Sequence, residues 1–145
     1  MDTTAAIDRP PKHLWIVGIL ALLWNCMGAL DYVMTTSRNA SYLASFTPEQ
    51  LTYFYSFPAW VIATWAIAVW GGVLGSVLIL LRKRLAVPVL GVSLAAMMST
   101  SVYNFVLSKG LAIMGQGAAV FSSVIFVIAL ALLLYARWVA RRGWL

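Results

Sequence analysis

Four long apolar runs constrain this 145-residue chain more than any other feature. A bilayer core about 30 Å thick needs about 20 apolar residues, because a helix rises 1.5 Å per residue. The runs of this length are 14–34, 58–81, 85–107 and 117–139. Since 63% of the residues are hydrophobic, an ordinary soluble domain is excluded. The sequence therefore predicts an all-α membrane protein, with four transmembrane helices in one domain.

Short segments connect or flank these runs: an N-terminal tail over 1–13, a basic turn over 82–84, an outer loop over 108–116 and a C-terminal tail over 140–145. The longest connection, 35–57, contains Thr47-Pro48-Glu49-Gln50, a pattern that predicts a capped helix start. The helix expected over 48–57 is rich in aromatic residues, which is typical of a helix in the membrane interface. We therefore expect an antiparallel four-helix bundle with one short interfacial helix in the first extracytoplasmic loop.

The basic residues predict how the chain is oriented in the membrane. Of its 10 Lys and Arg residues, only Arg38 and Lys109 would lie on one side, and the others would lie on the opposite side. The positive-inside rule then places both termini in the cytoplasm. The residues assigned to topology and headgroup contact are Arg82, Lys83, Arg84, Arg137, Arg141 and Arg142. Because the basic groups flank apolar runs, we expect a lipid bilayer as partner and no nucleic acid.

The first span is polar on one side. Wound at 100° per residue, it places one set of residues within a sector of about 120°, opposite a largely aliphatic face. This set is Gly18, Ala21, Trp24, Asn25, Gly28, Asp31 and Tyr32. Asn25 lies about 16 Å into the span, where a polar side chain needs a protein partner. Asp31 is near the end of the span, so it either reaches the headgroups or faces the interior of the bundle.

The predicted orientation brings the polar residues of the other spans to the same outer half. Thr64 lies about 9 Å below the outer end of its span, and Thr100 and Asn104 lie about 22 and 28 Å from the cytoplasmic end of theirs. This asymmetry predicts a polar cavity that opens outward above an apolar plug, with the 48–57 helix as a lid. The expected ligand-binding residues are Asn25, Asp31, Tyr32, Thr64, Thr100 and Asn104. Hydrogen bonds between helices explain the same residues equally well.

Small residues predict where helices approach closely. Gly28 lies in the polar sector of the first span, and Gly71 and Gly75 form a Gly-x-x-x-Gly motif in the second. A single four-helix bundle is slim for a lined transport pathway. Transport would therefore imply a homo-oligomer, for which the stripe of Gly71 and Gly75 is the expected contact.

Catalytic and metal-binding constellations are absent from the sequence. His13 is the one histidine and sits at the predicted cytoplasmic boundary, while Cys26 is the one cysteine and lies on the aliphatic face of its span. A metal or haem site within the bundle, an internal disulfide and a pair of intramembrane carboxylates therefore lack their parts. We expect no enzyme activity, no metal and no cofactor.

Several motifs carry a resemblance that covers nearly the whole chain. They are Trp24-Asn25-x-x-Gly28-x-x-Asp31-Tyr32, Pro58-x-Trp60, Trp70-Gly71-Gly72-x-x-Gly75-Ser76, Leu81-Arg82-Lys83-Arg84-x-Ala86 and Arg142-Gly143-Trp144-Leu145. In these the chain resembles a small bacterial family of four-span inner-membrane proteins, whose members are often labelled hypothetical membrane proteins or sugar transporters. The resemblance implies the bacterial inner membrane as the location and brings no established activity.

Two functions of different classes fit the sequence. The first is binding, and with it transport, of a small solute or lipid through the outward-facing cavity. The second is a non-catalytic accessory or assembly role in a larger membrane complex. A binding protein should be stabilised by its ligand, whereas an accessory subunit should be extracted together with other subunits at fixed stoichiometry.

Overall fold

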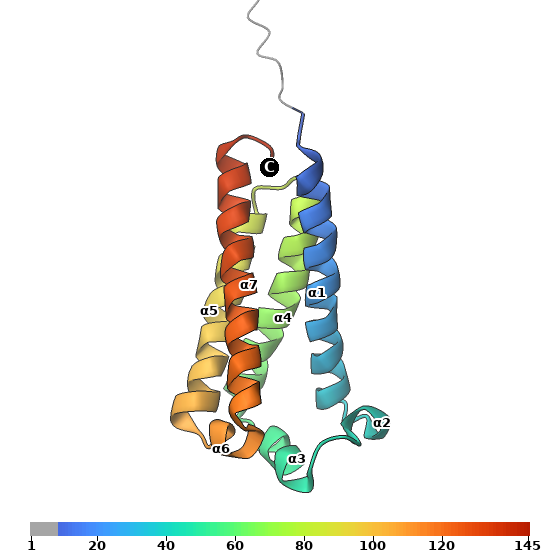
Figure 1. Cartoon of the computed structure of the whole chain (residues 1–145), viewed down its shortest axis with the longest axis vertical. Coiled ribbons are helices and arrows are strands. Elements are labelled where there is room, and N and C mark those ends of the chain that lie inside the picture. Colours follow the sequence, from blue (N-terminus) through green and yellow to red (C-terminus); the bar gives the residue numbers. More distant parts are fainter. Residues whose placement is uncertain (1–8) are drawn as a thin grey trace, which may run out of the picture.

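The computed structural model describes residues 9–145, and within them it is helical and contains no β-strand (Figure 1). Four helices in this range are long and apolar enough to cross a membrane. They are α1 (Lys12–Thr36), α4 (Ala59–Leu80), α5 (Ala86–Val102) with its π-helical continuation η1 (Tyr103–Leu107), and α7 (Gln116–Arg141). This confirms the expected all-helical class and indicates a multi-pass membrane protein. Residues 1–8 of the expected tail lie outside the described residues.

Three shorter helices lie between the long ones: α2 (Ala40–Leu43), α3 (Pro48–Tyr55) and α6 (Gly110–Met114). At the start of α3, the Thr47 side chain accepts a hydrogen bond from the Gln50 amide, and the Gln50 side chain accepts one from the Thr47 amide. The helices α2 and α6 fall in segments where the sequence analysis expected none. Asn39 caps α2 through a 3.0 Å bond from the Tyr42 amide.

The long helices pack in a chain of neighbours, in which α1 lies along α4, α4 along α5, and α5 along α7 (Figure 1). The beginning of α1 and the end of α7 are at the top of the view, which we call the terminal end. The helices α2, α3 and α6 gather at the opposite end, which we call the loop end. The two ends are built from different kinds of contact.

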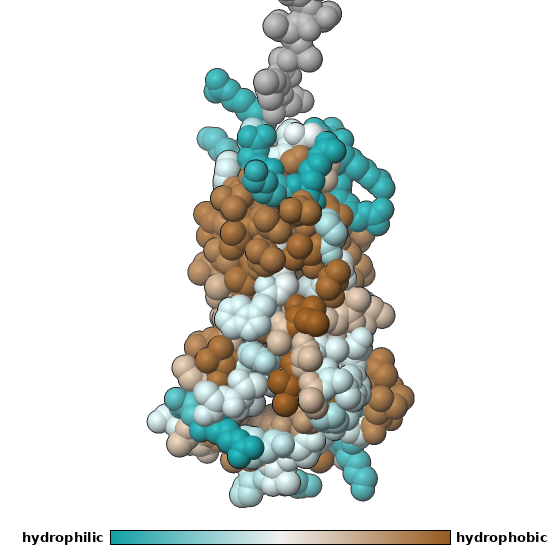
Figure 2. All heavy atoms as spheres, turned by 180° about the vertical axis from the view of Figure 1, so that it is seen from behind, coloured by the Kyte–Doolittle hydropathy of each residue, from teal (hydrophilic) through white to brown (hydrophobic). Residues whose placement is uncertain are grey.

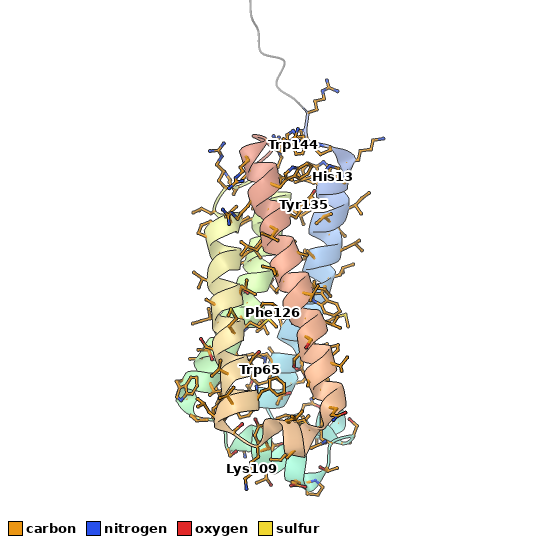
Figure 3. All side chains as sticks on the ribbon, turned by 60° about the vertical axis from the view of Figure 1, so that its left-hand side comes forward. His13, Trp65, Lys109, Phe126, Tyr135 and Trp144 are labelled. Carbon is orange, nitrogen blue, oxygen red and sulfur yellow. The ribbon has the colours of Figure 1, made fainter. Side chains whose placement is uncertain are left out.

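Aliphatic packing holds the terminal end together. One buried cluster, the terminal core, comprises Leu14, Ile79, Ala86, Leu90, Leu132, Ala136 and Val139. Above it, His13 Nδ1 lies 2.6 Å from the Tyr135 hydroxyl, and the His13 ring stacks on Trp138. His13, Tyr135 and Trp144 gather at this end of the bundle in Figure 3. This end is therefore filled and capped by aromatic rings.

The glycines of the second span face helices of the same chain. A Cβ added at Gly71 would lie 3.0 Å from Cβ of Ser93, and one added at Gly75 would lie 2.6 Å from Cγ of Leu90. Both partners belong to α5. Within this chain the stripe therefore packs on α5, and the expected oligomer contact stays a prediction. Gly28 of α1 faces Val69 of α4 in the same way, at 3.7 Å.

The third span departs from the regular helix expected over 85–107. Its last turn is the π-helix η1. The Asn104 amide nitrogen donates to the Thr100 carbonyl at 3.1 Å, and the Ser108 hydroxyl donates to the Asn104 carbonyl at 3.3 Å. Side-chain donors that reach carbonyls four residues earlier compete with the backbone amides of a regular helix. Such π-helical turns are rare and are frequent at functional sites.

Candidate ligand-binding cavity

An open cavity of about 590 Å³ extends from the terminal core to the loop end. Leu90 and Leu132 of the terminal core border it at one limit, and Tyr53 and Gly110 border it at the other. A cavity of this size lies within the range of about 300–1,000 Å³ that small-molecule sites occupy. All four long helices contribute lining residues, as do α2, α3 and α6.

The walls are mainly apolar and aromatic. The aromatic lining residues are Trp24, Tyr42, Phe46, Tyr53, Phe54, Phe57, Trp65, Phe105 and Phe121. Three of them form a row along α3 and the segments on either side of it: the ring of Phe54 lies 5.2 Å from that of Phe46 and 6.1 Å from that of Phe57. The Phe57 ring in turn approaches Trp65 of α4 at 6.3 Å. Each of these contacts has the edge-to-face geometry that aromatic pairs prefer.

Tyr53 links α3 to the end of the third span by hydrogen bonds at the loop end. Its side chain is only 7% exposed, and its hydroxyl donates to Asn104 Oδ1 at 2.6 Å and lies 2.7 Å from the Ser108 hydroxyl. Burial raises the pKa of the Tyr53 hydroxyl, so the proton needed for this bond is retained at neutral pH. Gly110 leaves room for the contact, because a Cβ there would lie 2.6 Å from the Tyr53 hydroxyl. The helix α3 therefore forms the floor of the cavity.

Several polar lining groups are used to join helices. The Thr100 hydroxyl donates to the Ala96 carbonyl at 3.1 Å and lies 2.9 Å from the Thr64 hydroxyl, which links α5 to α4. Ser93 donates to the Ala68 carbonyl at 2.6 Å across the same interface. Together with the bonds of Asn104, these contacts match the interhelical hydrogen-bond interpretation of the sequence.

Two polar lining side chains keep an acceptor oxygen that no described residue bonds to. The Asn25 amide nitrogen donates to the Ala21 carbonyl at 2.8 Å and to the Ser76 hydroxyl at 3.1 Å, and no donor among the described residues bonds to its Oδ1. Asp31 Oδ1 accepts a 2.5 Å bond from the Tyr42 hydroxyl, which leaves Oδ2. This bond, with some burial and the nearby charge of Asp31, raises the pKa of Tyr42 to about 12. Tyr42 is therefore a donor at neutral pH.

The six residues predicted from the sequence divide into two groups. Asn25, Asp31, Thr100 and Asn104 border the cavity, while Tyr32 and Thr64 are not among its lining residues. The Tyr32 ring packs edge-on against Trp65, with 4.9 Å between centroids. Thr64 lies behind Thr100, to which it is hydrogen-bonded. The aromatic lining was not predicted from the sequence, although the aromatic character of 48–57 was the signal for Tyr53, Phe54 and Phe57.

A second depression lies on the outer surface between α5, η1 and α7 and measures about 450 Å³. Ser101, Phe105 and Ser122 line both this groove and the cavity. The wall between them is thus one side chain thick. Apart from Ser123, the rest of the groove lining is apolar, and its residues Val106 and Val127 are 74% and 62% exposed.

The charge inside the cavity is negative. Of the described residues that line it, Asp31 alone is acidic and none is Lys, Arg or His. No cluster of three or more potential metal ligands occurs within residues 9–145.

Comparisons of this chain with protein-family models, with curated proteins and with solved structures gave no match. The resemblance to small bacterial four-span proteins therefore depends on the sequence motifs alone.

Proposed function

We propose that this protein binds a small amphiphilic molecule inside the membrane, in the cavity between its long helices. The observation that carries the proposal is the cavity itself, whose apolar and aromatic walls surround a few convergent polar atoms. This combination is typical of small-molecule sites. In a bundle held by hydrogen bonds alone, side chains would fill this space, as they fill the terminal core.

The proposal includes an orientation of the protein in the membrane. Figure 2 shows one face of the molecule, with a hydrophilic cap at the terminal end, a strongly hydrophobic band below it and a paler half towards the loop end. The cap carries Arg82 and Arg84, which donate to main-chain oxygens of Trp144 and Leu145. By the positive-inside rule the cap faces the cytoplasm, and the cavity opens towards the outer half of an antiparallel bundle. The resemblance to small bacterial four-span proteins supports the bacterial inner membrane as the location.

The location of the opening favours a ligand that partitions into lipid. α3 closes the loop end beneath the cavity, whereas the groove beside η1 and α7 lies on the surface that would face acyl chains. A molecule in the outer leaflet could therefore reach the cavity past Ser101 and Ser122. The terminal core blocks passage to the cytoplasm, so this conformation binds its ligand, and transport would require that core to open.

Ligand binding can be tested with a cavity-filling variant and a matched control on the same helix. Ala129 lines the cavity, whereas Ala131, two residues further along α7, is on the exposed surface. The probes are tetraphenylphosphonium, tetraphenylborate and triphenylmethanol, added to purified protein in lipid nanodiscs. We expect at least one probe to quench tryptophan fluorescence saturably and raise Tm, through Trp24 and Trp65 at the site.

Ala129→Trp should abolish this binding, and Ala131→Trp should preserve it. If no probe binds wild-type protein, or if Ala129→Trp binds as tightly as wild type, the proposed function is wrong. In the first case, unrelated subunits recovered at fixed stoichiometry in mild detergent would support the alternative role of an accessory subunit.

A further inference from the structure

We infer that the ligand of this cavity is a lipophilic organic cation, with Asp31 as its counter-charge. The inference deepens the proposed function and rests on it. It comes from the charge and the acceptor oxygen of Asp31 and from the aromatic rings at the loop-end half of the cavity.

The carboxylate of Asp31 has no opposite charge within the cavity lining. Asp31 is half-buried in a lining that, over the described residues, contains no basic side chain. Arg38, which follows it at the loop end, places its guanidinium 4.1 Å from the centroid of the Tyr55 ring, and Tyr55 is outside the lining. A carboxylate inside a membrane protein is costly without a partner. In this cavity the ligand is the group that can supply the positive charge.

The hydrogen-bonding atom that Asp31 leaves unused is an acceptor. This atom is Oδ2 of the carboxylate, whereas Asn25 Oδ1 lies against Gly72 of α4. The donors of the same two sites are already used, because the Asn25 amide nitrogen bonds to Ala21 and Ser76, and the Tyr42 hydroxyl bonds to Asp31. A ligand with an N–H group can donate to Asp31 Oδ2, and a quaternary ammonium or phosphonium group still provides the opposite charge.

Aromatic rings form much of the cavity surface at the loop end. Phe46, Phe54, Phe57 and Trp65 form a continuous row of edge-to-face pairs along the floor and the α4 wall. The faces of such rings carry negative potential and attract organic cations, most strongly where water is excluded. Apolar groups on the cation would occupy the remaining walls, which the aliphatic residues of α7 provide.

Other ligand classes fit less well. An anion would meet Asp31 with no basic group to receive it. A neutral molecule would fill the apolar space but leave the carboxylate without a counter-charge, and a sugar would expose many hydroxyls to aromatic walls that offer few partners. The cavity therefore selects for positive charge on an apolar body.

The experiment compares the three probes named above, because tetraphenylphosphonium and tetraphenylborate share one shape and differ in the sign of their charge, while triphenylmethanol is neutral. We expect wild-type protein to bind the cation about tenfold or more tightly than either of the others. Asp31→Asn should remove this preference and leave the affinity for triphenylmethanol unchanged. Glu49→Gln, which removes a carboxylate on the exposed side of α3, should retain the preference.

The outcomes separate this inference from the proposed function. Equal affinity for all three probes, lost together in Ala129→Trp, would overturn the cation assignment and keep the binding function. A preference for the cation that survives in Asp31→Asn would also overturn it. Binding of triphenylmethanol by Asp31→Asn shows that the cavity of this variant is folded. If that variant fails to fold, a wild-type protein that binds tetraphenylborate as tightly as the phosphonium still refutes the inference.

Discussion

Replacing Gly72 by alanine should destabilise the bundle, because the added methyl group would occupy the space of the Asn25 side chain. Gly72 is buried on α4, and a Cβ there would overlap Asn25 Oδ1 and lie 2.8 Å from Cγ. Asn25 has little freedom to move, because its amide nitrogen is bonded to Ala21 of its own helix and to Ser76 of α4. The substitution should therefore displace the amide and break the bond between α1 and α4.

The magnitude follows from three terms. Overpacking costs ~1–3 kcal/mol, a lost hydrogen bond between membrane helices costs ~0.6 kcal/mol, and alanine regains ~1 kcal/mol of helix propensity. The net loss in the free energy of unfolding is ~0.6–2.6 kcal/mol. Gly91 on α5 is the matched control, because a Cβ there meets no atom within 4 Å. Gly91→Ala should keep the stability of the wild type or gain up to ~1 kcal/mol.

Unfolding of the purified protein in mild detergent, followed by circular dichroism, measures both variants. In an Asn25→Ala background, Gly72→Ala should lower the free energy of unfolding much less than it does in the wild type, because the truncated side chain at position 25 leaves room for the methyl group. The reasoning is refuted if Gly72→Ala is as stable as Gly91→Ala. It is also refuted if the cost is the same in the Asn25→Ala background.

Two further predictions concern the tyrosines at the loop end. Tyr53→Phe should lower the free energy of unfolding by ~1–2 kcal/mol, because Asn104 and Ser108 lose their shared partner, and should speed amide hydrogen exchange in α3. Unchanged exchange would show that α3 is held by packing alone. Asp31→Asn should lower the pKa of Tyr42 from about 12 towards 10.0, because both the hydrogen bond and the charge are removed. The pKa of Tyr42 is higher in the folded protein than in the unfolded chain. The stabilisation from the Tyr42–Asp31 pair is therefore complete below pH 10.0 and is lost as the pH rises through about 12. The difference in phenolate absorbance between wild type and Tyr42→Phe measures the titration, and an unshifted midpoint in Asp31→Asn would contradict the assignment.

The sequence predicted those parts of the fold that the bilayer or the nearest neighbours determine. The second span was expected over 58–81 and is Ala59–Leu80 in the structure, because hydrocarbon thickness limits a helix with polar ends. The start of α3 follows from Thr47 and Gln50, whose bonds involve only residues three positions apart. Such signals need no knowledge of the tertiary packing.

The partners of the polar side chains could not be predicted in the same way, because helical periodicity gives the face of a residue and not what lies opposite. Tyr32 and Asp31 are neighbours on one face, yet the ring of Tyr32 packs on Trp65 while Asp31 borders the cavity. The depths of Thr64 and Thr100 along their spans predicted that both lie in the same half of the bundle. They did not predict that the two side chains bond to each other. The π-helix η1 likewise depends on bonds that Asn104 and Ser108 make in the folded chain.

The two ends of the bundle show why a cavity can persist in so small a protein. Lipid is as apolar as leucine, so helices in a membrane associate through close packing and hydrogen bonds. The terminal core supplies the packing, and bonds such as those of Thr64 with Thr100 hold the loop-end half without filling it. Substitutions in these bonds should therefore lower stability and binding together. Substitution of Asp31, which joins no pair of long helices, should change the choice of ligand with little effect on the bundle. A loss of stability in Asp31→Asn as large as that in Thr64→Ala would show that the carboxylate, too, serves the fold.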